Sequence, residues 1–296
     1  MRIERAGDSL IVHCPAKVNL FLEVLGTRPD GYHEIETVMQ AISLYDTLQL
    51  QPAHELSLEV QPPVVSAGED NLVMRAAALL RQHTGTGAGA RMGLAKRIPV
   101  GGGLGGGSSD AAGTLVGLVR LWGLSVPLDE LHALAAQLGS DVPFFLYGGT
   151  ALCKGRGELV TPLPWTLDVY YTLVSPDISI STQEMYHALD RHLTGEAVCC
   201  RIALDSGRRL GIDALASAMH NAFERIAYQL YPSLSGIKHA LLEAGAKAAM
   251  LSGSGATVYG VCASRAEAHR VAERVKAHGR VIVAEPESVS AQPTRR

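Results

Sequence analysis

The sequence predicts an α+β fold, and three observations support this prediction. The chain has 296 residues, 47% of them hydrophobic and 19% charged, which suits one large or two medium domains with a real core. A glycine-rich loop runs into an amphipathic helix in the first half, whereas strands and helices mix in an α+β order in the second. A proline-bearing stretch, Thr161–Trp165, is the predicted boundary between the halves.

The first half is predicted to hold most of its strands before the glycine-rich loop. Alternating side chains indicate a strand at Ser9–Cys14, which Pro15 and Ala16 interrupt and which resumes over Lys17–Leu25. After a turn at Thr27–Gly31, the expected elements are a strand at Ile35–Leu50, a helix at Leu72–His83 that Asp70 and Asn71 cap and that stops near Gly85, a strand at Ala90–Ile98, helices at Ala111–Trp122 and Leu128–Leu138, and a strand from Gly148 to Cys153.

The second half is predicted to begin with a new strand at Leu167–Val174. The elements expected after it are a helix containing Met185 and Tyr186, helices at Ile212–Leu230 and Leu234–Glu243, a hairpin of Ala248–Leu251 and Ala256–Cys262, a helix at Glu267–His278 and a strand at Val281–Ala284. Residues from Pro286 onward have the composition of a disordered tail.

Composition argues against several classes of function. The net charge is −3 and the chain has no basic run, so neither a nucleic acid nor an anionic membrane is an expected partner. Glycine or charge interrupts every apolar stretch before it could span a bilayer. Five cysteines, an odd number without a C-x-x-C pair, indicate a reducing, cytoplasmic compartment, and the histidines show no zinc-binding pattern.

The most informative stretch is the loop Pro99–Asp110, in which six of the seven residues from Gly101 to Gly107 are glycine. Glycine lets the backbone adopt positive φ angles and come close to a ligand. The run ends in two serines and an aspartate and continues into the helix that Leu115, Leu118 and Val119 mark. Backbone N–H groups at a helix start favour a phosphate, so a phosphate-binding loop is preferred over a flexible linker.

The glycine pattern alone does not identify the class of phosphate-binding loop. The G-x-x-x-x-G-K-[ST] pattern fails because the loop contains no lysine. Gly101, Gly103 and Gly106 satisfy the dinucleotide pattern G-x-G-x-x-G, but any run of glycines does so by accident. The protein-kinase pattern fails because Ser108 stands where valine is required.

Three other segments carry polar residues that could serve structure or chemistry. Lys17, Asn19, Phe21 and Glu23 share one face of a predicted strand, opposite the apolar face of Val18, Leu20, Leu22 and Val24. From this stretch alone an ordinary solvated face is favoured over a small polar site. Tyr32 and His33, after the turn, could stack on and hydrogen-bond a planar ligand, or could be a half-buried aromatic beside a surface histidine. Asp141, two residues before a proline, has the pattern of a helix N-cap, although a carboxylate fixed there could also act as a base.

Taken together, these motifs resemble the GHMP family of small-molecule kinases, which includes galactokinase, homoserine kinase and mevalonate kinase. The resemblance rests on the loop ending in Ser108–Ala112, on Leu251–Gly255 and on Asp141-Val142-Pro143. The pieces Pro15–Leu20 and Asp30–Glu34 resemble the members of the family whose substrate carries a cytidine diphosphate group. Val100 stands where methionine is expected, and Asp110 stands where asparagine is also common. Residues 194–209 match nothing that we can place.

The resemblance implies a fold and a set of roles. The fold would be a ribosomal S5 domain 2-like N-terminal domain, residues 1–163, and a ferredoxin-like C-terminal domain, residues 164–285, followed by the tail 286–296. Asp141 would be the general base and Lys17 its partner, while Asn19, Tyr32, His33, Thr182 and Tyr186 would bind the cytidine end of the substrate. The ATP phosphates would lie on Pro99, Val100, Gly101, Gly102, Gly103, Leu104, Gly105, Gly106, Gly107, Ser108 and Ser109. Mg²⁺ would be carried mainly by those phosphates, with Ser108 or Ser109 as candidate ligands.

Other functions remain open at this point. The chain could be a GHMP kinase for another small alcohol, such as homoserine or mevalonate, or a dinucleotide-binding oxidoreductase that uses the accidental glycine pattern. A catalytically inactive sensor on the same fold is a third alternative. The presence of both Lys17 and Asp141 argues against it. The sequence does not distinguish a monomer from a homodimer.

Overall fold

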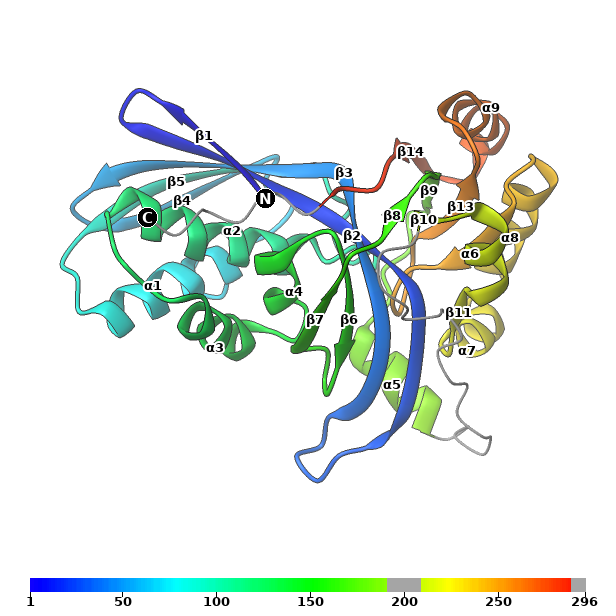
Figure 1. Cartoon of the computed structure of the whole chain (residues 1–296), viewed down its shortest axis with the longest axis horizontal. Coiled ribbons are helices and arrows are strands. Elements are labelled where there is room, and N and C mark those ends of the chain that lie inside the picture. Colours follow the sequence, from blue (N-terminus) through cyan, green and yellow to red (C-terminus); the bar gives the residue numbers. More distant parts are fainter. Residues whose placement is uncertain (191–208, 289–296) are drawn as a thin grey trace.

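The computed structural model describes residues 1–190 and 209–288. Helices and strands are mixed along these residues, as predicted, in two main sheets with helices packed on them and a further two-stranded sheet (Figure 1). Of the stretch 194–209, which matched no pattern that we could place, residues 194–208 lie outside the described residues, as does the tail from residue 289.

The larger sheet has eight strands, and most of its pairings are antiparallel. Its main path runs β1-β2-β3-β5-β4, while β6 pairs with β3 and β7, and β11 pairs with β2. The strands are β1 (Arg2–Ala6), β2 (Ser9–Thr27), β3 (His33–Ala53), β4 (Leu56–Gln61), β5 (Gly89–Ala95), β6 (Thr150–Lys154), β7 (Leu159–Leu163) and β11 (His220–Asn221). The predicted strands of the first half are confirmed, although β2 and β3 are longer than expected and β5 ends three residues early.

Four helices cover one face of this sheet and form its core with it (Figure 1). They are α1 (Leu72–Thr84), α2 (Gly106–Leu121), α3 (Leu128–Leu138) and α4 (Val142–Tyr147). The Asn71 side chain accepts a hydrogen bond from the Val73 N–H at the start of α1, and Gly85 ends that helix with φ +66°. The predicted helices are therefore confirmed, and α2 begins inside the glycine run rather than after it.

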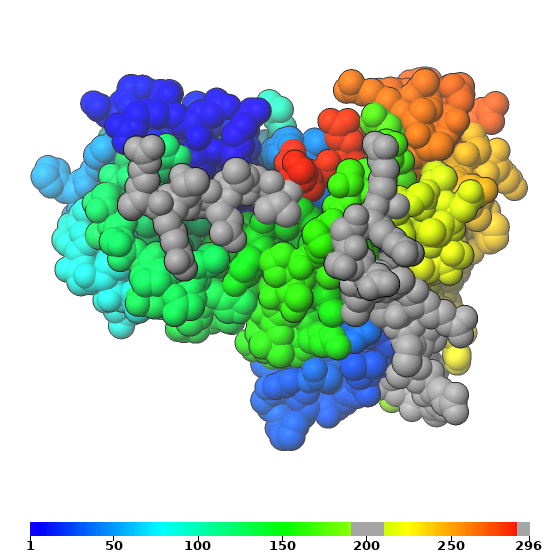
Figure 2. Space-filling model, in the orientation of Figure 1, coloured from blue at the N-terminus to red at the C-terminus, as the bar shows by residue number. Residues whose placement is uncertain are grey.

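The hairpin of β2 and β3 connects the two halves of the molecule, and its tip protrudes at the lower edge in Figure 2. The prediction that Pro15 and Ala16 interrupt the first strand is wrong. Pairing with β3 continues past them, and the register shifts there by a bulge. A second shift between Asn19 and Phe21 reverses the alternation of side chains, so Phe21 packs in the apolar core instead of beside Lys17.

The smaller sheet has four antiparallel strands in the order β12-β13-β9-β14. Along the chain, helices lie between β9 and β12 and again between β13 and β14. This is the ferredoxin-like arrangement. The elements are β9 (Tyr170–Ser175), α5 (Thr182–Asp190), α6 (Ile212–Ala218), α7 (Glu224–Leu230), α8 (Pro232–Glu243), β12 (Ala248–Leu251), β13 (Val258–Cys262), α9 (Arg265–Val275), the 3₁₀ helix η1 (Lys276–His278) and β14 (Arg280–Ala284), with β8 (Thr166–Leu167) and β10 (Arg209–Leu210) pairing beside them.

One predicted helix of the second half is wrong. Residues 212–230 form two helices, α6 and α7, because the chain between them extends along β2 as β11. Asn221 in this segment donates to the carbonyls of Leu251 and Gly253, both at 2.8 Å. These side-chain contacts to distant backbone carbonyls, together with the pairing of β11 on β2, outweigh the helical preference of the local sequence.

The two sheets meet through an apolar layer. Tyr171, Leu173 and Tyr259 of the smaller sheet pack with Val18, Phe21 and other side chains of the long hairpin. The start of the predicted tail belongs to this structure, because Pro286 bridges to Ile42 and the Glu287 N–H donates to the Ala41 carbonyl at 2.8 Å. The division of the chain at residue 163 stays a prediction.

Candidate active site

The glycine-rich loop connects β5 to α2 and turns on glycines in the left-handed region. Gly101, Gly103 and Gly105 have φ angles near +70°, at +69°, +72° and +69°. Gly105 precedes the first turn of α2, so the loop leads its backbone amides to the positive end of that helix. The Lys17 N–H donates to the Leu104 carbonyl at 3.0 Å and holds the loop against β2. The prediction of an anion-binding loop at a helix start is consistent with this geometry.

A second glycine turn, residues 252–255 between β12 and β13, packs directly on the first. A Cβ atom added at Gly103 would lie 2.0 Å from the Ser252 carbonyl oxygen, so only glycine fits there. The Ser252 hydroxyl donates to the Gly103 carbonyl at 3.0 Å, and the Thr257 N–H donates to the Gly102 carbonyl at 3.2 Å. The two halves of the molecule therefore meet at two loops that are hydrogen-bonded to each other.

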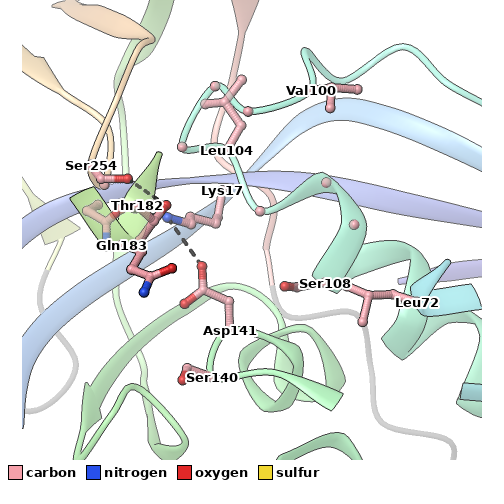
Figure 3. Close-up of a pocket in the computed structure, with 18 of the residues that line it drawn as sticks. Lys17, Leu72, Val100, Leu104, Ser108, Ser140, Asp141, Thr182, Gln183 and Ser254 are labelled. Carbon is pink, nitrogen blue, oxygen red and sulfur yellow. Dashed lines mark hydrogen bonds and ion pairs between the residues drawn. The ribbon is translucent and has the colours of Figure 1, made fainter. Parts of the chain in front are cut away.

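Lys17 and Asp141 meet beside the loop, and Figure 3 shows their side chains pointing toward each other. Lys17 Nζ lies 3.5 Å from Asp141 Oδ2 and donates to Asn19 Oδ1 at 2.7 Å. Lys17 and Asn19 are only 3% and 2% exposed, so the favoured interpretation of a solvated face is wrong. The Asn19 amide in turn donates to the Thr37 hydroxyl at 2.8 Å. Lys17, Asn19 and Thr37 are thereby linked by hydrogen bonds inside the sheet.

Asp141 stands at the N-cap of α4, as its position before Val142-Pro143 predicted. Its side chain, however, caps no N–H group of that helix, and its backbone is αR. The carboxylate instead pairs with Lys17 and is partly exposed to the cavity. The cap interpretation therefore accounts for the backbone position of Asp141 but not for its side chain.

Four of the five residues predicted at the substrate end come together from the turn before β3, the start of β3, and α5. The His33 ring stacks on the Tyr186 ring with centroids 4.5 Å apart and an angle of 23° between the planes. Tyr32 is half exposed, and the Arg156 guanidinium lies 4.5 Å from the centre of its ring. The Thr182 hydroxyl pairs with the Ser254 hydroxyl at 2.9 Å, which ties the start of α5 to the second glycine turn (Figure 3).

These groups line one cavity of about 950 Å³. Every predicted site residue except Ser109 contributes to its wall: Lys17, Asn19, Tyr32, His33, Pro99–Ser108, Asp141, Thr182 and Tyr186. Ser109 is fully buried behind the loop, and its hydroxyl has no hydrogen-bond partner among the described residues. Its predicted contact with phosphate is therefore not supported by its position.

Sequence reasoning missed several lining residues. Lys96, Arg156, Gly253 and Ser254 contribute to the cavity without having been singled out for the site. A signal existed only for the last two, within the Leu251–Gly255 motif. Lys96 and Arg156 carry no local pattern, and only the fold brings them to the wall.

A buried charge cluster lies beneath the loop. Lys96 Nζ donates to Asp110 Oδ2 at 2.8 Å and also contacts a carboxylate oxygen of Asp46, so two carboxylates share one ammonium. Burial raises the pKa of Asp110 to about 7; Lys96 opposes that rise and Asp46 adds to it. The second Asp110 oxygen has no partner in the part of the chain that the structure describes.

The described residues contain no group of three or more histidine, cysteine, aspartate or glutamate side chains that could hold a metal ion. In the same ranges, no helix combines the length and apolar character that crossing a bilayer requires.

Comparison with known proteins agrees with this geometry. The family description "GHMP kinases N terminal domain" matches residues 71–149, and "GHMP kinases C terminal" matches residues 202–281. A protein of Symbiobacterium thermophilum named 4-diphosphocytidyl-2-C-methyl-D-erythritol kinase is 45% identical over 270 residues, which are 90% of this chain and 95% of that protein. A protein of the same name from Pelotomaculum thermopropionicum is 44% identical, over 88% of this chain and 92% of its own.

The fold comparison leads to the same group of proteins. A crystal structure of 4-(cytidine 5'-diphospho)-2C-methyl-D-erythritol kinase superimposes with a TM-score of 0.78 at 36% identity and covers 93% of this chain and 98% of its own. The α+β fold and the resemblance noted from the motifs are thereby confirmed. The chain belongs to the GHMP kinase family of small-molecule kinases.

Proposed function

We propose that the chain transfers the γ-phosphoryl group of ATP to a hydroxyl of 4-diphosphocytidyl-2-C-methyl-D-erythritol, giving the 2-phosphate and ADP, in the non-mevalonate route to isoprenoid precursors. Relatives that are 45% and 44% identical over most of the chain carry the name of this kinase. The observation that carries the proposal is the placement of the Lys17–Asp141 pair on the wall of the cavity that the glycine loop also lines.

ATP would bind with its phosphates on the loop and its base in the more apolar end of the cavity. The loop amides and the start of α2 favour the negative charge of the phosphates. Beyond the loop, Val65, Leu72 and Val100 line the wall and offer apolar surface to a purine ring. ATP as the phosphate donor is the general property of the family to which the chain belongs.

The transfer needs positioning and charge stabilisation more than covalent chemistry. The Asp141 carboxylate would accept the proton of the substrate hydroxyl while the hydroxyl oxygen attacks the γ-phosphorus. The bond from that phosphorus to the bridging oxygen breaks, and ADP leaves with the electron pair. Lys17, held by Asn19 at 2.7 Å, would place its positive charge beside both the carboxylate and the transferred group.

Mg²⁺ would be bound mainly by the ATP phosphates, because it retains several waters and takes few protein ligands. Of the two serines considered, Ser108 lines the cavity and can offer one oxygen, whereas Ser109 is buried away from it. When bound, the ion would offset negative charge on the phosphates.

The opposite end of the cavity would hold the cytidine group. Tyr32 and Tyr186 offer aromatic faces, His33 offers ring nitrogens and Thr182 a hydroxyl. Asn19 has less freedom, because Lys17 and Thr37 already engage both ends of its amide. Its direct contact with the substrate stays a prediction, and its support of Lys17 rests on the geometry described above.

An ADP-release assay tests the proposal. The cytidine diphosphate substrate, mevalonate, homoserine and galactose are offered separately with ATP and Mg²⁺. We expect release of ADP with the cytidine diphosphate substrate and little with the other three. Turnover that does not depend on the cytidine group would overturn the proposed substrate and favour another small alcohol.

A further inference from the structure

Protein groups already hold the His33 ring on two sides. One face stacks on Tyr186 of α5, and His33 Nε2 lies 2.6 Å from the Oδ1 atom of Asp190, the last residue of the same helix. His33 itself is the first residue of β3. The ring is therefore fixed in position and orientation by two residues that lie more than 150 positions away in the chain.

This contact determines which nitrogen of the ring carries a proton. An ionised carboxylate only accepts hydrogen bonds, so the Nε2 atom of His33 must donate to Asp190. In the neutral ring, Nδ1 is then an acceptor with a free lone pair. Nδ1 has no partner among the described residues, and His33 lines the cavity.

A free acceptor on a residue that lines the cavity would distinguish two pyrimidines by the group at C4. Cytosine carries an amino group there, which donates, whereas uracil carries a carbonyl oxygen, which accepts. An acceptor on the protein attracts the first and repels the second. A site built to hydrogen-bond one group rejects an analogue that cannot supply it, because its own polar atom is left unpaired.

We propose that Asp190 is a positioning residue that sets the preference for cytosine over uracil by holding His33 in the tautomer with hydrogen on Nε2. The inference rests on the proposed function, since it concerns the cytidine end of that substrate. Asp190 acts through His33 and contacts no substrate atom itself. The Thr27 hydroxyl, on the hairpin, also donates to Oδ1 of Asp190, at 3.5 Å. Thr27 and His33 therefore share this carboxylate oxygen.

The kinetic test compares variants on matched substrates. D190A removes the acceptor, D190N keeps an amide oxygen that can still accept the Nε2 hydrogen, and E184Q removes an exposed charge from the same helix as the control. Each protein is assayed with the cytidine diphosphate substrate and with its uridine diphosphate analogue, and kcat and KM are determined separately.

We expect D190A to reduce the ratio of the two kcat/KM values by about tenfold, the scale of one lost hydrogen bond with a partner left unpaired. The change should lie in KM for the cytidine substrate, with kcat and the KM for ATP nearly unchanged. D190N should lose less, and E184Q should match the wild type. A purely structural role for Asp190 would lower kcat/KM for both substrates equally; an unchanged ratio in D190A overturns the proposal.

A spectroscopic measurement tests the tautomer without turnover. ¹⁵N NMR of the histidine ring, assigned with H33Q, is recorded for the wild type and D190N in the absence of ligands. We expect the wild-type His33 ring to carry hydrogen on Nε2 with Nδ1 unprotonated. A wild-type ring protonated on Nδ1 would refute the inference even if the enzyme phosphorylates the cytidine substrate. Absence of that activity, with the expected tautomer present, would instead refute the proposed function.

Discussion

The two ends of the cavity are built from different parts of the polypeptide. At the loop end, the contiguous residues Pro99–Ser108 line the cavity, and they offer mainly backbone amides. At the other end, side chains line the cavity. Tyr32 lies just before β3, His33 begins β3, and Tyr186 lies in α5, far away in the sequence. A backbone cradle can be predicted from one local stretch, whereas a constellation of side chains exists only once the fold has formed. The Lys17–Asp141 pair stands where the two ends meet.

The largest expected effect is at this junction. D141N should lower kcat by about 10²-fold or more, the scale of losing a general base, because the amide cannot accept the hydroxyl proton. ATP affinity, measured by titration calorimetry, should stay near that of the wild type, since the loop end is left intact. The control is D129N, which neutralises an exposed carboxylate in the first turn of α3. A near-normal kcat in D141N would leave Asp141 with only its structural position at the start of α4.

The next effect separates two glycines of the same loop. G103A places a Cβ atom 2.0 Å from the Ser252 carbonyl oxygen and requires alanine at a φ angle of +72°. We expect it to lower ATP affinity by about tenfold and the free energy of unfolding by about 1–3 kcal/mol. The measurements are nucleotide titration and urea unfolding.

The matched control for that change is G107A, at a glycine inside α2. The added Cβ atom would lie 3.5 Å from Leu72 Cδ1 of α1, which is an ordinary contact. Because alanine favours a helix over glycine, G107A should be neutral in stability or gain about 0.5–1 kcal/mol. Equal losses in the free energy of unfolding of the two variants would mean that the stability of the loop does not depend on its contact with the second glycine turn.

Substitutions at the side-chain end should act mainly on substrate binding. Y32A and H33A each remove an aromatic surface of the cavity, and we expect KM for the cytidine substrate to rise by several-fold to about tenfold with little change in kcat. L25A removes an exposed side chain from the same hairpin and is the control. Steady-state kinetics measures both constants. A lower kcat at unchanged KM would mean that these rings act in phosphoryl transfer and not in substrate binding.

The smallest expected effect on catalysis concerns the charge cluster under the loop. The pKa of Asp110 in the folded chain is about 7, against an ordinary value of 3.8, because burial favours its neutral form. Between these values the folded state binds more protons than the unfolded state, so this group's contribution to stability falls as pH rises from about 4 to about 7. The D110N variant has no ionisable group at this position, so its stability lacks this dependence on pH.

D110N should therefore gain stability relative to the wild type as the pH is raised from about 5 to about 8, by about 2–3 kcal/mol, which is the effect expected for a pKa of 3.8 in the unfolded chain and about 7 in the folded chain. Urea unfolding of both proteins at the two pH values measures the difference. A stability difference that does not change with pH would show that Asp110 does not titrate between the folded and unfolded states in this range.

Most of the fold was predictable because its signals are local. Apolar residues at helical spacing marked α2 and α3, while Asn71 and Gly85 marked the two ends of α1. The helix predicted over residues 212–230 failed because long-range contacts replace its middle by β11. The bulges of β2 were also missed, since they depend on pairing with β3.

The site divides in the same way. The glycine loop was predicted from its own residues, while Lys17 and Asn19 looked like a solvated face because nothing local shows that Asp141, Thr37 and the loop enclose them. Their roles followed only from resemblance to a family. Asp190, Arg156 and Lys96 could not be found from the sequence, because each reaches the site through contacts with distant elements.

The most direct test of the account is a crystal structure of the chain with a non-hydrolysable ATP analogue, Mg²⁺ and the cytidine diphosphate substrate. We expect the γ-phosphate to lie on the glycine loop at the start of α2, and the hydroxyl to be phosphorylated to lie within hydrogen-bonding distance of the Asp141 carboxylate. A hydroxyl out of reach of Asp141, or phosphates bound away from the loop, would contradict the account.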